Sequence, residues 1–152
     1  MAQPKLFNDA HHVCIIVRDI EKATKYYESL GIGPWKDFPS LEPYLGHLDE
    51  DGKSAYMSLH YRFANLNNIQ LQLCQPKEGK SPQWKFLLEK GEGVYHIGFS
   101  VEDLDASEKV AQEIGLEVRA HGRRADGAGF TYFETENEGA GVTLEIRAAG
   151  LS

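Results

Sequence analysis

The chain has little that would tie it to a membrane, a polyanion or an oxidising compartment. Its 152 residues include only two cysteines, Cys14 and Cys74, which are too few for a disulfide framework and fit a reducing compartment. No apolar run approaches the length of a membrane span, and the start, MAQPKLFNDA, lacks the apolar core of a signal peptide. A net charge of -7 without a block of Lys or Arg argues against nucleic acid and anionic membranes as partners. We therefore expect a cytoplasmic protein that acts on a small molecule.

What the chain does contain is an internal repeat within an ordinary globular composition. With 41% hydrophobic and 26% charged residues, it can bury the core of a single domain, which we assign to residues 1–152. Residues 12–32 align without a gap to residues 96–116. The identities fall at His12 and His96, Val17 and Val101, Asp19 and Asp103, Lys25 and Lys109, and Gly31 and Gly115.

Each copy of the repeat predicts a strand followed by a helix. In the first copy, Val13, Ile15 and Val17 alternate as one face of a strand, so that His12 points to the other face. Asp19 is typical of a helix N-cap, and Gly31 is typical of a helix C-cap. The second copy shows the same pattern from His96 to Gly115.

The remainder of each half predicts further strands. Residues 54–76 read as a hairpin that turns at residues 65–68, with the acidic residues 49–51 in a turn before it, and residues 117–148 read as three short strands. We thus expect an α+β fold of two βαβββ modules at about residues 9–77 and 93–149. A linker helix at about residues 82–90 follows the N-cap Ser81.

The last strands of the two halves also correspond. IQLQLC (69–74) matches VTLEIR (142–147), which sets Gln72 against Glu145 on the polar faces of their strands. Two imidazole nitrogens, an amide oxygen and a carboxylate suit zinc, cobalt, nickel or manganese. The repeat symmetry therefore predicts one divalent metal site, and its ligands are His12, Gln72, His96 and Glu145.

These residues resemble a known family over nearly the whole chain. The pattern HHVCIIVRDIEKATKYYESLGI, IQLQLCQP, GEGVYHIGFSVEDLD and GVTLEI is similar to the vicinal oxygen chelate superfamily, which includes glyoxalases, bleomycin-resistance proteins and dioxygenases. Within it, KSPQWKFLLEKGEGVYHIGFSVEDLD most resembles methylmalonyl-CoA epimerases. The resemblance implies a U-shaped metal-binding cup, commonly a homodimer, and ligands at the four positions already identified.

The resemblance also implies a reaction through a metal-held enolate, with Glu145 as ligand and base. A cation on the substrate oxygen stabilises the charge that develops when the adjacent carbon loses its proton. Epimerases of this kind need a second carboxylate from the middle strands of the first half, and none can be placed in the strand YMSLHYRFA. Its inward face carries either the polar set with His60 and Arg62 or their apolar neighbours. The polar set is the natural choice.

His60 and Arg62 therefore have two readings. On the inward face, His60 could serve as a base and Arg62 could bind a carboxylate; otherwise both are polar residues on a solvated sheet face. Arg123 and Arg124 of the glycine-rich segment GRRADGAGF could similarly meet an anionic group of the substrate or remain solvated.

Three alternatives to an epimerase stay open. One is a glyoxalase I-like lyase that acts on a hemithioacetal. A ligand-sequestering protein of the bleomycin-resistance type is another, although the complete ligand set counts against it. A dioxygenase is less favoured, because Gln72 fills a position that oxygen chemistry leaves free.

Overall fold

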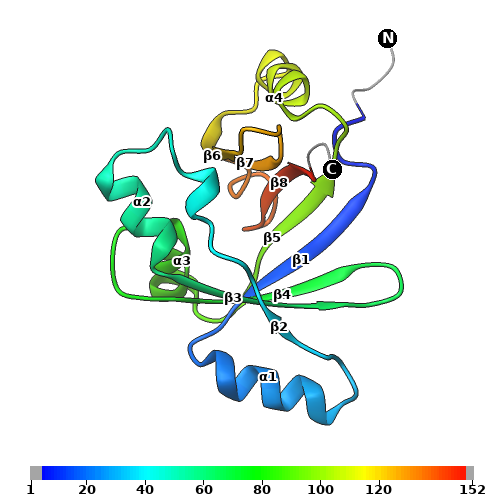
Figure 1. Cartoon of the computed structure of the whole chain (residues 1–152), viewed down its shortest axis with the longest axis vertical. Coiled ribbons are helices and arrows are strands. Elements are labelled where there is room, and N and C mark those ends of the chain that lie inside the picture. The colour runs from blue at the N-terminus through cyan, green and yellow to red at the C-terminus, as the bar shows by residue number, and fades with distance from the viewer. Residues whose placement is uncertain (1–4, 150–152) are drawn as a thin grey trace. The chain divides into compact units, whose positions relative to one another are not determined.

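The computed structural model describes residues 5–149, so that residues 1–4 and 150–152 of the predicted domain lie outside the described part. Within that range the chain is a mixed α+β protein with eight strands, four α-helices and one short 3-10 helix (Figure 1). It divides into two compact units. The N-terminal unit holds residues 12–42 and 48–95, and the C-terminal unit holds residues 5–11, 43–47 and 96–149.

The N-terminal unit contains a four-stranded arrangement in the order β2-β3-β4-β1. β1 (Ala10–Ile16) runs parallel to β4 (Gln70–Pro76), whereas β2 (Lys36–Asp37) and β3 (Leu59–Asn65) pair antiparallel to each other, and β3 to β4. The α-helices are α1 (Ile20–Ser29), α2 (Glu50–Met57) and α3 (Pro82–Lys90). The 3-10 helix η1 (Glu42–Tyr44) begins in this unit at Glu42, and its other two residues belong to the segment 43–47 of the C-terminal unit.

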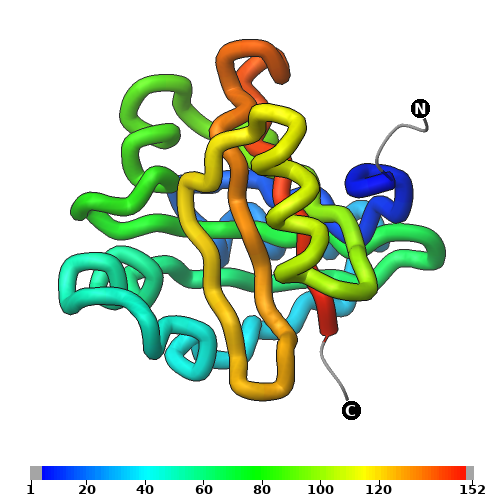
Figure 2. The backbone as a smooth tube through the Cα atoms, turned by 90° about the horizontal axis from the view of Figure 1, so that it is seen from above, coloured from blue at the N-terminus to red at the C-terminus, as the bar shows by residue number. Residues whose placement is uncertain are grey.

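The C-terminal unit repeats this topology. It contains β5 (Gly93–Ser100), α4 (Leu104–Glu113), β6 (Val118–Arg123), β7 (Gly129–Phe133) and β8 (Thr143–Ala148). The strand order is β6-β7-β8-β5, with β5 parallel to β8 and the other pairs antiparallel. Figure 2 shows β6 and β7 side by side as a hairpin. The predicted βαβββ order is thus confirmed in both halves.

The matched aspartates and glycines bound the repeated helices as predicted. Asp19 accepts a hydrogen bond from the backbone N of Lys22 at 3.1 Å, and Asp103 accepts one from Ala106 at 3.0 Å. Each bond satisfies a backbone donor that the first helical turn leaves without an intrahelical partner. Gly31 and Gly115 follow the helices with φ of 85° and 98°, a conformation that suits glycine.

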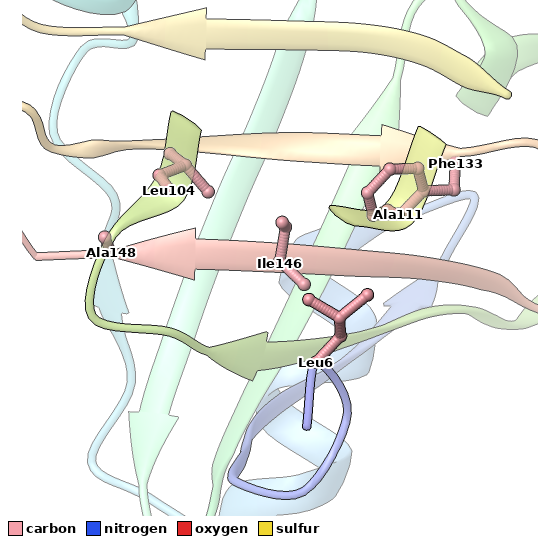
Figure 3. Packing of buried hydrophobic residues seen from close by; sticks show 6 residues of the cluster. All are labelled: Leu6, Leu104, Ala111, Phe133, Ile146 and Ala148. Carbon is pink, nitrogen blue, oxygen red and sulfur yellow. The ribbon is translucent and has the colours of Figure 1, made fainter. Parts of the chain in front are cut away.

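The repeated helices cover the apolar faces of their strands. In the C-terminal unit, Leu104 and Ala111 of α4 pack against Phe133 and Ile146 of β7 and β8 (Figure 3). In the N-terminal unit, α1 covers a cluster that holds Val17, Ile20 and Leu73, with Ile15 and Ala23 at its edge. Because strand side chains alternate, the opposite faces of these strands carry the remaining, more polar residues.

The segment before β3 differs from the prediction. Residues 50–57 form the helix α2, and not a turn and a strand start, because Asp49 caps a helical turn through a 2.8 Å bond from Gly52 N. The alternation of apolar and polar residues in YMSLHYRF therefore does not mark one continuous strand. Its first two residues end α2, and β3 begins at Leu59.

The helix α3 follows the prediction. Ser81 accepts a bond from Trp84 N at 3.0 Å, Pro82 is the first helical residue, and Gly91 ends the helix with φ of 83°. None of the helices in residues 5–149 is long and apolar enough to cross a bilayer.

The two N-cap aspartates give a direct test of the repeat. We expect Asp19→Ala and Asp103→Ala each to lower the free energy of unfolding by about 1 kcal/mol, because each leaves a helical N–H without its acceptor. The effects should add in the double variant, since the two caps lie in separate units. Urea denaturation of both variants, with Asp→Asn substitutions as controls that keep the acceptor, measures this. A loss at one position alone would contradict the equivalence of the helices.

Candidate metal centre

In the N-terminal unit, His12 and Gln72 lie on the face of the sheet that α1 leaves uncovered. The parallel register pairs His12 with Gln70 and Cys14 with Gln72, so these four side chains share one face. Ile15 and Leu73 point to the other face, under α1. His12 and Gln72 are both buried, with 3% and 5% of their surface exposed.

In the C-terminal unit, His96 and Glu145 occupy the matched positions. β5 and β8 pair His96 with Thr143 and Gly98 with Glu145, and Ile146 turns to the other face, under α4. His96 Nε2 lies 2.9 Å from Glu145 Oε2, and both residues are buried. The His96 ring also meets the ring of Tyr132 edge to face at 5.1 Å.

Each unit thus contributes one buried imidazole and one buried oxygen donor. Buried polar groups need compensating partners, and a buried carboxylate in particular needs a nearby positive charge. His12, His96 and Glu145 each offer a nitrogen or carboxylate oxygen of the kind that binds borderline divalent cations, and the amide of Gln72 offers a further oxygen. The donor set fits the predicted metal.

His60 and Arg62 lie on the opposite face from Gln72, so the choice of the polar set as inward was wrong. The antiparallel register places Phe63 opposite Gln72 and Arg62 opposite Leu73. Tyr61 and Phe63 therefore share the face of Gln72. The alternation had two possible phases, and the apolar phase is the inward one: Tyr61 is buried in a cluster with Cys14 and Cys74.

Both polar residues instead join β3 to β2 and α1. His60 Nε2 lies 3.0 Å from Asp37 Oδ1, and Arg62 donates to Asp37 at 2.9 Å and to Thr24 of α1 at 3.2 Å, with Glu21 as a further ion partner. The hydrogen bonds from His60 and then from Arg62 lower the pKa of Asp37. The hydrogen bond from Arg62 lowers the pKa of Glu21, and the two carboxylates raise the pKa of Arg62 above its usual value.

Arg123 likewise lies on the helix side of its unit. It pairs in register with Gly129, and its guanidinium donates to Asp105 at 2.9 Å and to Thr131 at 3.0 Å, with Glu108 at 3.3 Å. Glu145 pairs with Tyr132, on the other face. The structure does not bring Arg123 to the face of Glu145, and the expectation that it meets a substrate there is not supported by this geometry.

Arg124 follows in the turn and has a different environment. Its guanidinium lies over the Tyr44 ring at 5.6 Å and donates to Asp126 at 2.9 Å, with about half of the side chain exposed. Tyr44 contacts the Phe130 ring at 6.0 Å, and Phe130 contacts Tyr132 at 5.3 Å. A row of aromatic rings therefore links the surroundings of His96 to Arg124.

Sequence reasoning missed these inward aromatic residues. Phe63 stands opposite Gln72, and Tyr132 stands opposite Glu145, so each oxygen donor has an aromatic neighbour across the strand pair. The signal was present in GFTYF, where Phe130 and Tyr132 alternate with Thr131.

The described strands of the N-terminal unit provide no inward carboxylate that could serve as the second one an epimerase of this kind needs. At the inward positions of β2, β3 and β4, the register places Lys36, Leu59, Tyr61, Phe63, Asn65, Gln70, Gln72 and Cys74, and none of them is Asp or Glu. Cys14 and Cys74 are buried thiols, as expected, and burial raises the pKa of Cys74 to about 12. At neutral pH its thiol is protonated and is a poor metal ligand.

Comparisons with known proteins agree with this architecture. Residues 11–133 match the model of the Glyoxalase/Bleomycin resistance protein/Dioxygenase superfamily. The mitochondrial methylmalonyl-CoA epimerase of Homo sapiens is 31% identical over 122 residues, which cover 74% of this chain and 61% of that protein. The chain therefore spans less than two thirds of the length of this relative.

Two solved structures show the same fold. The methylmalonyl-CoA epimerase of Mycobacterium tuberculosis superposes with a TM-score of 0.73 at 20% identity, over 99% of this chain and 94% of that one. A variant of the Streptomyces coelicolor methylmalonyl-CoA epimerase, in complex with 2-nitronate-propionyl-CoA, gives 0.73 at 21% identity, over 95% and 99% of the two chains.

The placement of Arg62 makes a prediction about stability and pH. The carboxylates of Asp37 and Glu21 have ordinary pKa values of 3.8 and 4.5, and both values are lowered in the fold. Their stabilising contribution is therefore present above the ordinary values and is lost as the pH falls through the folded values. Arg62→Leu should destabilise the chain at pH 7, and the difference from the unaltered protein should shrink near about pH 3.

Denaturation at both pH values measures this effect, with Lys22→Met, at an exposed lysine of α1, as control. Metal affinity should change by less than about twofold, because Arg62 lies on the other face of the sheet from Gln72. An equal loss of stability at both pH values, or a large loss of metal affinity, would contradict the placement of Arg62.

Proposed function

Since the chain belongs to the glyoxalase/bleomycin resistance protein/dioxygenase superfamily, we propose that it is a divalent-metal-dependent epimerase. Its substrate is a thioester of the methylmalonyl-CoA type, the compound named for the human relative. The observation that carries the proposal is the duplicated donor pair: a buried histidine and a buried oxygen donor on matched strands in each unit.

The proposed ligands are His12, Gln72, His96 and Glu145, around a single ion. Support comes from the matched positions of the repeat. His12 and Gln72 lie on the face of β1 and β4 that α1 leaves uncovered, and His96 and Glu145 hold the matched positions on β5 and β8.

The chemistry follows from where charge develops. A bound divalent ion supplies positive charge to the substrate carbonyl oxygen, which becomes negative when the adjacent carbon loses its proton. Glu145 is the proposed base as well as a proposed ligand, and its Oε2 atom lies 2.9 Å from Nε2 of His96, the other proposed ligand of the same unit. Phe63 stands across the strand pair from Gln72, and Tyr132 stands across from Glu145, so each oxygen donor has an aromatic neighbour in its own unit.

His60, Arg62 and Arg123 do not take part in this proposal. Arg62 and Arg123 bind carboxylates of α1 and α4 and so join each helix to its sheet, whereas His60 binds Asp37 and joins β3 to β2. Arg124, at the end of the aromatic row, stays the proposed contact for an anionic part of the substrate.

The comparisons favour the epimerase over the alternatives. The curated relative is an epimerase, so the lyase acting on a hemithioacetal and the sequestering protein are not favoured. The homodimer, the cytoplasmic location and the identity of the metal stay predictions.

Hydrogen exchange tests the reaction directly. We expect metal-loaded protein in heavy water to introduce deuterium at the carbon between the two carbonyl groups of methylmalonyl-CoA, because the proposed base removes that proton. Proton NMR measures the exchange, with chelator-treated protein as the control. Absence of exchange by the metal-loaded protein, together with turnover of a hemithioacetal, would replace the epimerase by the lyase.

Glu145→Gln tests the role of the carboxylate. The amide preserves the size of the side chain and removes both its charge and its basicity, so we expect exchange to fall by about a hundredfold or more. Glu113→Gln, at an exposed position of α4, is the matched control and should leave the rate unchanged. Retained activity in the Glu145 variant would remove this residue from its proposed role.

A further inference from the structure

A chain of three amide side chains runs along the inward face of the N-terminal unit. Gln72 Nε2 donates to Gln70 Oε1 at 2.7 Å, and Gln70 Nε2 donates to Asn65 Oδ1 at 3.0 Å. Gln70 pairs in register with Asn65 on β3 and with His12 on β1, so the chain of amides lies at the level of the first histidine. Gln72 is buried, and Gln70 is half-buried.

The direction of these bonds distinguishes the two ends of the Gln72 amide. An amide has one oxygen that can bind a cation and one NH₂ group that can only donate. Because Gln70 Oε1 accepts a hydrogen bond from Gln72 Nε2, the amide nitrogen of Gln72 is held toward Gln70. The amide oxygen of Gln72 is therefore directed away from Gln70. Asn65 in turn engages the nitrogen of Gln70 and so holds its oxygen toward Gln72.

We propose that Gln70, held by Asn65, is a positioning residue that presents Gln72 Oε1 to a divalent cation. The inference rests on the proposed metal function. When a residue that orients a metal ligand through the ligand's second polar atom is removed, metal affinity commonly falls by about 10–100-fold.

The C-terminal unit shows why such a residue is needed in one half only. The residue two positions before Glu145 is Thr143, which donates to Glu136 at 2.7 Å and accepts from Arg119 at 3.0 Å. A carboxylate has two equivalent oxygens and binds a cation through either, whereas an amide must be turned the right way. The half that supplies an amide ligand therefore carries an amide neighbour to orient it.

Cobalt binding tests the proposal. Chelator-treated protein is titrated with Co²⁺ alone, and both the affinity and the visible absorption spectrum of the bound ion are recorded. We expect Gln70→Leu to weaken binding by about tenfold and to alter the spectrum, and Asn65→Leu to have a smaller effect in the same direction. The double variant should bind no more weakly than Gln70→Leu, because Asn65 acts through Gln70. Gln112→Leu, at an exposed glutamine of α4, is the control.

A second background separates orientation from a merely structural role. Gln72→Glu replaces the amide by a carboxylate with two equivalent oxygens, so adding Gln70→Leu to this variant should leave the cobalt affinity unchanged. A structural role of Gln70 would weaken binding in both backgrounds, and thermal unfolding of the metal-free proteins detects it independently.

The outcomes are distinguishable. Unchanged affinity and spectrum in Gln70→Leu, or an equal loss in the Gln72→Glu background, would overturn the positioning role and leave the proposed function intact. Failure of the unaltered protein to bind Co²⁺ would overturn the metal-dependent function, and the positioning role along with it.

Discussion

The alternation of side chains along paired strands is the constraint on which the rest of this structure depends. In each unit one strand face is apolar and lies under a helix, and the other carries the buried polar donors. A slip of one residue between β1 and β4 would exchange Leu73 for Gln72 under α1. The free energy of burying the apolar face, about 1.5–3 kcal/mol for each large side chain, thereby also fixes the positions of the proposed metal ligands.

Charged side chains hold the covering helix to the sheet in the same way in both units. Arg62 of β3 and Arg123 of β6 each reach from the sheet to the covering helix. Their helix partners, Glu21 and Thr24 in one unit and Asp105 and Glu108 in the other, occupy matched positions of the repeat. Both guanidinium groups are largely buried between helix and sheet, with 16% and 18% of the side chains exposed, and each has carboxylate partners that compensate for its desolvation.

The sequence was sufficient for much of this architecture, and the reasons are local. Matched N-cap aspartates, C-cap glycines and apolar alternation predicted both βαβββ modules and the linker helix, because each signal acts within a few residues. The helix α2 escaped prediction because YMSLHYRF alternates through a helix end. The sequence also did not predict which side chains of β3 face inward, since only the pairing with β4 decides between Arg62 and Phe63. The orientation of Gln72 depends on hydrogen bonds between side chains, which no pattern of residue types encodes.

The central claim is that two repeated units supply two donors each to a single divalent ion. X-ray absorption at the zinc edge of zinc-loaded protein tests it most directly. We expect one ion per chain, with scattering from two imidazoles and oxygen neighbours at about 2.0–2.2 Å. A sulfur neighbour near about 2.3 Å would instead indicate Cys14, which shares the face of Gln72, and scattering from a single imidazole would mean that one unit binds the ion alone.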